Sequence, residues 1–406
     1  MLSQFTVKNF KSIRDEITLD MQATGISEHT NSIINGKDGE KFLPLAVIYG
    51  PNGGGKSNVI EAMISLLSLV RLPLCAVCSE KDCHYKIKKM PITPFLFNNT
   101  NRDMPTEYEI YFRTKIAEYR YILHIKEGVI IKESLDRIKI DTHRQSSLFY
   151  RDQKEGIILK GSLKKLKISN NITETLPLLS YLGITYKKTS VIFDVINWFE
   201  NTIDFLDYAN PFQELGVAIP QSERTKKRIL LMANEMGINI NDFHIEEKNE
   251  KKRLYIEHIV DGFKTKIPFE DESSGTQKIF GLLPYVMESL LNGTILLADE
   301  IDAKLHPLLI KYIIELYSNM TINTKGAQLI FTSHDLTTMN SSEFRRDEIW
   351  FVAMGNEQNS ILYSLVEFKT RKDAKFSKQY LEGKYGADPY LRKFINWGEE
   401  LNGKEE

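Results

Sequence analysis

The chain has 406 residues, of which 42% are hydrophobic and 10% aromatic, and its formal net charge is −1. This composition suffices for one large core or two ordinary domains. It argues against disorder and against an overall field that would attract nucleic acid or membrane. Residues 1–11 alternate apolar and polar side chains, so no signal peptide is expected, and no apolar run approaches the length of a membrane span. With three cysteines and no secretory signal, the expected location is cytoplasmic.

Alternating apolar and polar residues indicate β-strands in the first part of the chain. Strands are predicted over 2–10, 17–21 and several segments of 108–140, with a glycine-containing loop over 22–41. The continuous apolar run 43–49 is typical of a strand buried on both faces. Apolar residues at helical spacing follow over 58–72, so a strand, a glycine loop and a helix occur in succession.

The chain is predicted to divide near residues 150 and 245. We expect 1–149 and 246–406 to form the two halves of one unit, with an antiparallel β subdomain in the first half, and 150–245 to be a helical insertion or short arm. Helices are predicted over 190–206, 224–236, 277–292 and 308–317, and buried strands over 294–298 and 328–332. Strands that alternate with helices predict an α/β fold with a parallel sheet.

Residues 50–57 read GPNGGGKS and match the phosphate-loop pattern G-x-x-x-x-G-K-[ST] at every fixed position. Glycines let backbone N–H groups turn toward phosphate oxygens, and the following helix adds its positive N-terminus. Lys56 reaches the β- and γ-phosphates in such loops, and the Ser57 hydroxyl ligates Mg²⁺. The flanking strand and helix are the context that a phosphate loop requires, which favours this interpretation over a glycine-rich turn. The residues expected to bind ATP here are Asn52, Gly53, Gly54, Gly55, Lys56, Ser57 and Asn58.

Two carboxylates, Asp299 and Glu300, follow the predicted strand 294–298, at the end of a parallel strand where open α/β sheets bind ligands. Asp299 is the expected Mg²⁺ partner beside Ser57. Glu300 is suited to orienting or deprotonating an attacking water. Acids at a strand end are usually only solvated, but a phosphate loop in the same chain favours the catalytic interpretation.

Two further elements separate the classes of P-loop protein. The sequence SSGTQ at 273–277 starts a predicted helix with small hydroxyl residues and a glycine, which is typical of an anion-binding N-terminus. The sequence TSHD at 332–335 follows a buried strand, and its His334 is suited to sensing a γ-phosphate.

The order of these motifs resembles the heads of ABC-type ATPases of the SMC and RecF class. The segments NFKSI (9–13), GPNGGGKS (50–57), DEIDAKLHP (299–307) and YLEGKYGA (380–387) are similar to the OLD/RloC-like group of AAA family ATPases, which are common in bacterial anti-phage and abortive-infection systems. The resemblance covers about 1–145 and 245–395. It implies a P-loop ABC-type ATPase head that uses ATP and Mg²⁺ and forms a homodimer or higher oligomer through an ATP sandwich.

The resemblance also implies roles for individual residues. Ser273, Ser274 and Gly275 match the signature motif, which contacts the γ-phosphate held by the partner subunit, and 302–306 matches a loop that communicates across the dimer interface. His334 matches the switch histidine, with a catalytic role beside Glu300 and Lys56. Lys11 and Ser12 match a first-strand turn that touches nucleotide phosphate. No clear Q-loop glutamine lies between the phosphate loop and residue 150, although 94–97 is a candidate for that region.

Four potential metal ligands, Cys75, Cys78, Cys83 and His84, lie within ten residues. They have the residue types of a zinc site, but adjacent ligands are awkward to aim at one metal, and free thiols in a surface loop are the default. Basic segments at 160–167, 187–188, 224–228 and 251–253 are either the solvated faces of helices or a surface for DNA or RNA.

The leading hypothesis is an ATPase that dimerises around ATP and switches a partner, with a role in anti-phage defence implied by the resemblance. Residues 340–406 show no acidic cluster suited to two metals, so a nuclease or toprim-like effector is expected to be separately encoded. The alternatives are a RecF/SMC-like repair ATPase without an effector, the energising subunit of a membrane transporter, and a scaffold that hydrolyses ATP slowly. ATP-dependent DNA binding by the protein alone would favour the repair ATPase. Co-purification with a membrane protein would favour the transporter subunit.

Overall fold

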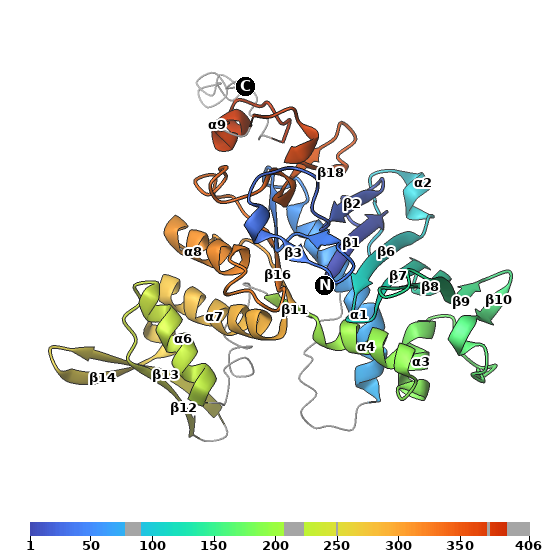
Figure 1. The fold of residues 1–406 in the computed structure, drawn as a ribbon, viewed down its shortest axis with the longest axis horizontal. Helices are drawn as coiled ribbons and strands as arrows, with labels where there is room; N and C mark the ends of the chain where they lie inside the picture. The colour runs from blue at the N-terminus through green and yellow to red at the C-terminus, as the bar shows by residue number, and fades with distance from the viewer. Residues whose placement is uncertain (78–90, 207–222, 249–250, 372–373, 388–406) are drawn as a thin grey trace, which may run out of the picture.

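The computed structural model describes residues 1–77, 91–206, 223–248, 251–371 and 374–387. The first of two large sheets is antiparallel and has the strand order β10-β9-β8-β7-β6-β1-β2 (Figure 1). Its strands are β1 (Leu2–Lys8), β2 (Ile17–Asp20), β6 (Thr106–Arg113), β7 (Ala117–Lys126), β8 (Val129–Lys139), β9 (Gln145–Asp152) and β10 (Gly156–Leu159). The predicted antiparallel β subdomain is therefore present.

The second sheet is mostly parallel, with the order β11-β15-β16-β5-β17-β18 and only β18 antiparallel to its neighbour. Its strands are β5 (Leu45–Tyr49), β11 (Ile203–Leu206), β15 (Ile295–Ala298), β16 (Gln328–Thr332), β17 (Ile349–Met354) and β18 (Ser360–Ser364). All residues of β5, β15 and β16 are buried. Because these three strands are parallel, their carboxyl ends meet at one edge of the sheet.

The parallel sheet separates two hydrophobic cores, and β5 shows how. Ala46 and Ile48 belong to the core shared with the antiparallel sheet, whereas Leu45, Val47 and Tyr49 belong to the core on the other face. This alternation is the two-residue period of a strand with both faces covered. The fold is accordingly α/β, as predicted.

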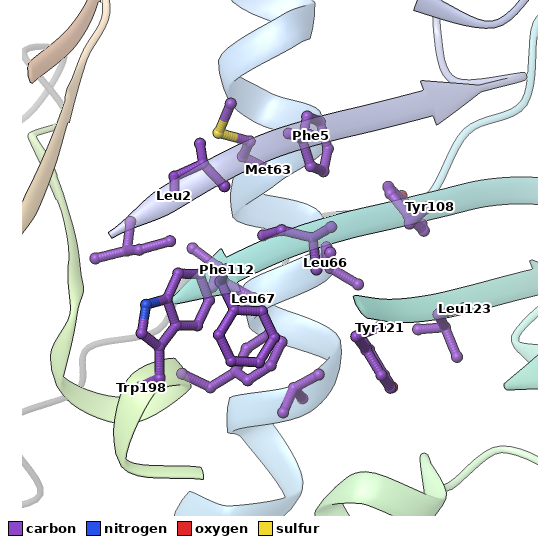
Figure 2. Packing of buried hydrophobic residues seen from close by; sticks show 14 of the residues in the cluster. Leu2, Phe5, Met63, Leu66, Leu67, Tyr108, Phe112, Tyr121, Leu123 and Trp198 are labelled. Carbon is purple, nitrogen blue, oxygen red and sulfur yellow. The ribbon is translucent and has the colours of Figure 1, made fainter. Parts of the chain in front are cut away.

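Helix α1 (Lys56–Ala76) fills the space between the two sheets. Figure 2 shows its Met63 between Leu2 and Phe5 of β1, and all three side chains belong to the core that α1 shares with the antiparallel sheet. By length and composition α1 is also apolar enough to cross a membrane, but 61% of its most apolar window is buried inside the fold. That burial is what a core helix requires.

The predicted insertion contributes to both sheets. Helices α3 (Leu178–Tyr186) and α4 (Ser190–Asn201) pack beneath the antiparallel sheet, and the Trp198 ring stacks on Phe112 with centroids 4.1 Å apart (Figure 2). The predicted helix 190–206 is wrong in its last residues, because α4 ends at Asn201 and Ile203–Leu206 forms β11. Pairing of β11 with the buried strand β15 outweighs the local helical pattern.

The other face of the parallel sheet carries α6 (Glu223–Glu235), α7 (Ser274–Asn292), α8 (Pro307–Ser318) and α9 (Phe376–Leu381). A three-stranded antiparallel sheet, β12 (Asp242–Lys248), β13 (Lys251–Val260) and β14 (Phe263–Pro268), extends from α6 and α7 at the lower left of Figure 1. The predicted helices at 58–72, 224–236, 277–292 and 308–317 are confirmed with shifted ends, and α7 accommodates Pro284 inside it.

Several short elements complete the described chain. The predicted loop 22–41 is only partly a loop, since β3 (Ile34–Asn35) pairs with β4 (Lys41–Phe42). A four-residue helix, α2 (Asn99–Arg102), precedes β6, and five 3-10 turns lie at η1 (Thr30–Ser32), η2 (Gly161–Leu163), η3 (Phe269–Asp271), η4 (Arg346–Glu348) and η5 (Leu365–Glu367).

Candidate functional site

The glycine loop joins β5 to α1 at the carboxyl edge of the parallel sheet. Gly50, Gly53 and Gly55 have φ values of 154°, 74° and 102°. Residues with a Cβ atom rarely adopt these backbone conformations. The glycines therefore permit the loop to curl around the start of the helix. Gly54 is buried, whereas Asn52 and Gly53 are exposed at the rim.

A cluster of small polar side chains closes against the end of this loop. The Ser12 and Ser360 hydroxyls lie 2.6 Å apart, Asn58 Nδ2 donates to Ser12 Oγ at 2.5 Å, and Ser360 Oγ donates to Gly54 O at 2.6 Å. A Cβ on Gly55 would approach Ser360 Oγ to 2.1 Å. Ser360 was not predicted, because it stands 306 residues from Gly54 and no local motif marks it.

The predicted first-strand residues differ in their surroundings. Ser12 belongs to the cluster beside the glycine loop, whereas the Lys11 amine pairs with Glu61 of α1. Lys11 has a left-handed φ of 50°, and its backbone N–H donates to Thr93 O at 2.8 Å. The segment 94–97 lies beside this turn, since Phe95 N donates to Asn9 Oδ1 at 3.0 Å.

The Lys56 side chain folds back over the glycine loop. Its Nζ donates to Gly50 O at 3.0 Å and to Pro51 O at 3.1 Å, and the residue is 6% exposed. Burial lowers the pKa of this amine, and the nearby carboxylates Asp299 and Glu300 oppose that shift. The structure therefore brings the glycine loop and the acidic strand end together, as the two motifs predict.

The acidic strand end is organised by Thr332, the last residue of β16. The Thr332 hydroxyl donates to Asp299 Oδ1 at 2.5 Å and accepts from Glu300 N at 2.7 Å. Glu300 has a left-handed φ of 47°, which is strained for a residue with a side chain. Thr332 lies in the predicted TSHD element, but its bridging role depends on strand pairing that local sequence does not reveal.

His334 lies beside Glu300. Its Nε2 is 3.9 Å from Glu300 Oε1, and its backbone N donates to Asp302 Oδ2 at 2.9 Å. The other carboxylate oxygen of Asp302 and Oδ2 of Asp335 are buried without a hydrogen-bond partner. Such orphaned acceptors are costly unless water or a ligand satisfies them.

A cleft of about 420 Å³ opens beside the start of the glycine loop and His334. Its described lining combines Tyr49 of β5 and the glycine-loop residues Gly50, Pro51 and Asn52 with Ser333, His334, Leu336, Tyr380 and Leu381. The last two belong to the YLEGKYGA segment. They are held there because Tyr380 stacks on Phe351 of β17, the strand beside β5, at a centroid distance of 5.7 Å.

The predicted signature residues stand apart from that lining. Ser273 caps α7 by accepting from Thr276 N at 3.1 Å, and both Ser273 and Ser274 are exposed. Three backbone carbonyls just upstream, those of Phe269, Glu270 and Glu272, accept from Gln277 Nε2 at 2.9 to 3.0 Å. The helix thus begins where it was expected to, with its small hydroxyl residues exposed and outside the lining of the cleft.

Only one of the four potential metal ligands lies among the described residues. Cys75 lies in the last turn of α1, whereas Cys78, Cys83 and His84 lie outside the described residues. Among the residues that are described, no group of three or more His, Cys, Asp or Glu side chains is arranged to hold a metal.

Known sequences and structures similar to this chain were also compared with it. A search of curated protein sequences gives no match. Similar solved structures include the Smc head bound to the C-winged helix domain of ScpA (15% identity, 90% of this chain and 98% of that one, TM-score 0.41) and the SMC head domain from Thermotoga maritima (14%, 89% and 98%, 0.39). A third is the Smc head with an extended coiled coil, bound to the C-terminal domain of ScpA derived from Pyrococcus furiosus (13%, 95% and 99%, 0.42).

These TM-scores are below 0.5, so the likeness assigns no activity to this chain. A family profile described as "AAA domain, putative AbiEii toxin, Type IV TA system" matches residues 45–340. The match runs from the first residue of β5 past His334 and so includes the glycine loop, the start of α7 and the acidic strand end. Since it spans more than half of the sequence, the chain belongs to this family of AAA ATPase domains.

Proposed function

We propose that this protein is an ATPase whose two copies close on each other around MgATP, and that the closed state acts on a separate partner. The observation that supports the proposal is that the motifs lie in two separate places. The glycine loop, Asp299 and Glu300 are assembled at one sheet edge, whereas Ser273 and Ser274 are exposed at a capped helix start. Exposed N–H and hydroxyl groups at such a helix start suit a γ-phosphate bound by a second copy.

The residues present fit a magnesium nucleotide. The Ser57 hydroxyl and the Asp299 carboxylate are hard oxygen donors of the kind that Mg²⁺ prefers, and a Cβ on Gly55 would collide with the surrounding serines, which is the mark of a close-fitting cradle. When bound, Mg²⁺ neutralises negative charge on the phosphates. Lys56, now held by two carbonyls, supplies the positive charge for the β- and γ-oxygens.

For hydrolysis we assign the base role to Glu300. Its carboxylate accepts a proton from water as the water oxygen bonds to the γ-phosphorus, and the bond from that phosphorus to the ADP oxygen breaks. His334, 3.9 Å from Glu300, is placed to hydrogen-bond the γ-phosphate or the water. Ser12 and Asn58 support the loop, while Lys11, paired with Glu61, has the weaker claim to a phosphate contact.

The finer biological proposal is a cytoplasmic switch of the OLD/RloC-like group that acts in anti-phage defence with a nuclease or toprim-like effector. The family description, which names a toxin of a toxin–antitoxin system, supports a role coupled to a partner. Two-state linkage then requires ATP to bind the closed dimer more tightly than the open one. The corresponding domain division keeps 1–149 and 246–406 as the head and 150–245 as an insertion that also adds β10 and β11 to the two sheets of the head.

The test is the oligomeric state of Glu300→Gln protein, measured by light scattering with and without MgATP. We expect a stable dimer only with MgATP, because nucleotide binds but is not turned over. Adding Ser274→Arg should return the protein to a monomer that still binds nucleotide, and Lys56→Ala should abolish binding itself. A Glu300→Gln protein that stays monomeric at saturating MgATP would contradict the proposal.

A further inference from the structure

We propose that Lys278 is a positioning residue that links the start of α7 to Glu300 within one subunit, and thereby links the two nucleotide sites of a dimer. This inference rests on the proposed function. It concerns a residue that lies outside the phosphate loop, the acidic strand end and the SSG sequence.

The contact that carries the inference is direct. Lys278 lies in α7 and is 7% exposed, and its Nζ donates to Glu300 O at 2.9 Å. One turn earlier, Gly275 approaches the same loop, since a Cβ built on it would lie 3.5 Å from Lys304 O. The first two turns of α7 therefore rest on the loop that begins with Glu300.

Helical spacing places the two functions on one face. Ser274 and Lys278 are four residues apart, so their side chains are neighbours on the surface of α7. Ser274 is exposed toward the proposed partner, whereas Lys278 is buried against Glu300. A shift of the helix start on docking would move the point that holds the Glu300 backbone.

Both backbone polar groups of Glu300, its N–H and its carbonyl, are hydrogen-bonded to side chains. Its N–H donates to the Thr332 hydroxyl at 2.7 Å, and its carbonyl accepts from Lys278. The left-handed conformation of Glu300, φ 47°, is strained for a residue with a side chain. These two hydrogen bonds stabilise it. Because the direction of the carboxylate follows from that backbone, the loss of either bond should misplace the proton acceptor.

Packing alone does not need an amine at this buried position. Burial lowers the pKa of Lys278 to about 8, even though Asp302 and Glu300 favour its charged form. A buried ammonium group is expensive, and an apolar side chain of similar length would fill the same space without that cost. Lys278→Met keeps a similar length but leaves the Glu300 carbonyl without its donor, so we expect a modestly lower melting temperature together with impaired turnover.

In a closed dimer each subunit would give Ser274 to its partner's nucleotide and Glu300 to its own. Lys278 joins these two groups, so nucleotide binding at one site should alter the geometry of the base at the other. The expected signature is hydrolysis that depends on ATP concentration with a Hill coefficient above one in the native protein, and close to one without the lysine.

The experiment compares full-length native protein with Lys278→Met, Lys278→Arg and Lys311→Met, a matched change at an exposed lysine of α8 that pairs with Glu343. Four quantities are measured: melting temperature, affinity for a fluorescent ATP analogue, ATP-dependent dimerisation in a Glu300→Gln background, and the ATP dependence of turnover. For Lys278→Met we expect kcat to fall about ten-fold with nucleotide affinity within roughly two-fold. Lys278→Arg should recover part of the rate, and Lys311→Met should match the native protein.

Unchanged kcat and Hill coefficient in Lys278→Met would overturn the inference, and so would equal losses in Lys278→Met and Lys311→Met. If Lys278→Met melts too low to be assayed, Lys278→Gln serves as the second variant, and native values of kcat and of the Hill coefficient in that protein would overturn the inference as well. A native protein that fails to dimerise with MgATP would instead refute the proposed function.

Discussion

The Thr332 hydroxyl lies 2.5 Å from the Asp299 carboxylate and so ties the end of β16 to the end of β15. The same oxygen accepts the Glu300 N–H, and Thr332 is fully buried. One side chain thus fixes both acids of the site: Asp299 through its oxygen and Glu300 through its backbone. Under the proposed function, Thr332 is therefore a positioning residue for both acids.

We predict that Thr332→Val lowers kcat by about ten-fold and stability by about 1–3 kcal/mol, because the valine keeps the shape but leaves Glu300 N and Asp299 without their buried partner. Thr332→Ser keeps the hydroxyl and should stay within roughly two-fold of the native rate. Steady-state hydrolysis and urea unfolding measure the two effects. Equal rates for the valine and serine variants would show that the hydroxyl does not position the acids.

The glycine loop offers a comparison within three residues. Gly55→Ala should abolish nucleotide binding and lower the melting temperature, because its Cβ would meet Ser360 Oγ at 2.1 Å and Ser12 Oγ at 2.5 Å in a left-handed backbone. Gly53→Ala should cost only about 1–2 kcal/mol of backbone strain, since nothing lies within 4 Å of its Cβ position. Fluorescent-nucleotide titration and calorimetry distinguish them. Comparable binding by both variants would contradict the cradle formed with Ser12 and Ser360.

These same residues show which parts of the site can be predicted from the sequence and which cannot. The glycine loop, Asp299, Glu300 and the start of α7 lie in contiguous motifs, whose spacing reflects one strand, one turn and one helix, and the structure places them as expected. Ser360 and Lys278 act through contacts with distant segments, so no local spacing reveals them. The strand Ile203–Leu206 was missed for the same reason: its partner β15 comes some ninety residues later.

The buried carboxyl of Glu348 predicts a pH dependence of stability. Burial raises its pKa to about 8, with Asp347 adding to the rise and a hydrogen bond from Arg345 N opposing it. The unfolded chain releases this proton near the ordinary value of 4.5, whereas the folded chain keeps it until about 8. Between these values the folded state binds more protons, so the free energy of unfolding should fall as pH rises.

Glu348→Gln should flatten that decline, because the amide cannot ionise. Urea unfolding at several pH values between about 5 and 8 measures the slope. Glu315→Gln, at an exposed position of α8, is the control and should leave the slope as it is in the native protein. An unaltered slope in Glu348→Gln would assign the pH dependence to other groups.

Leu381 lines the same cleft as Asn52 and His334, although the residue is 69% exposed. A charge at this position would face a bound triphosphate without disturbing the fold. Leu381→Glu should weaken nucleotide affinity by about two- to ten-fold through like-charge repulsion, and Leu381→Lys should strengthen it, with both effects fading at high salt. Leu231→Glu, 60% exposed on α6, is the matched control. If the two Leu381 variants bind a fluorescent ATP analogue equally well at low salt, α9 does not border the phosphate site, and the YLEGKYGA segment needs another explanation.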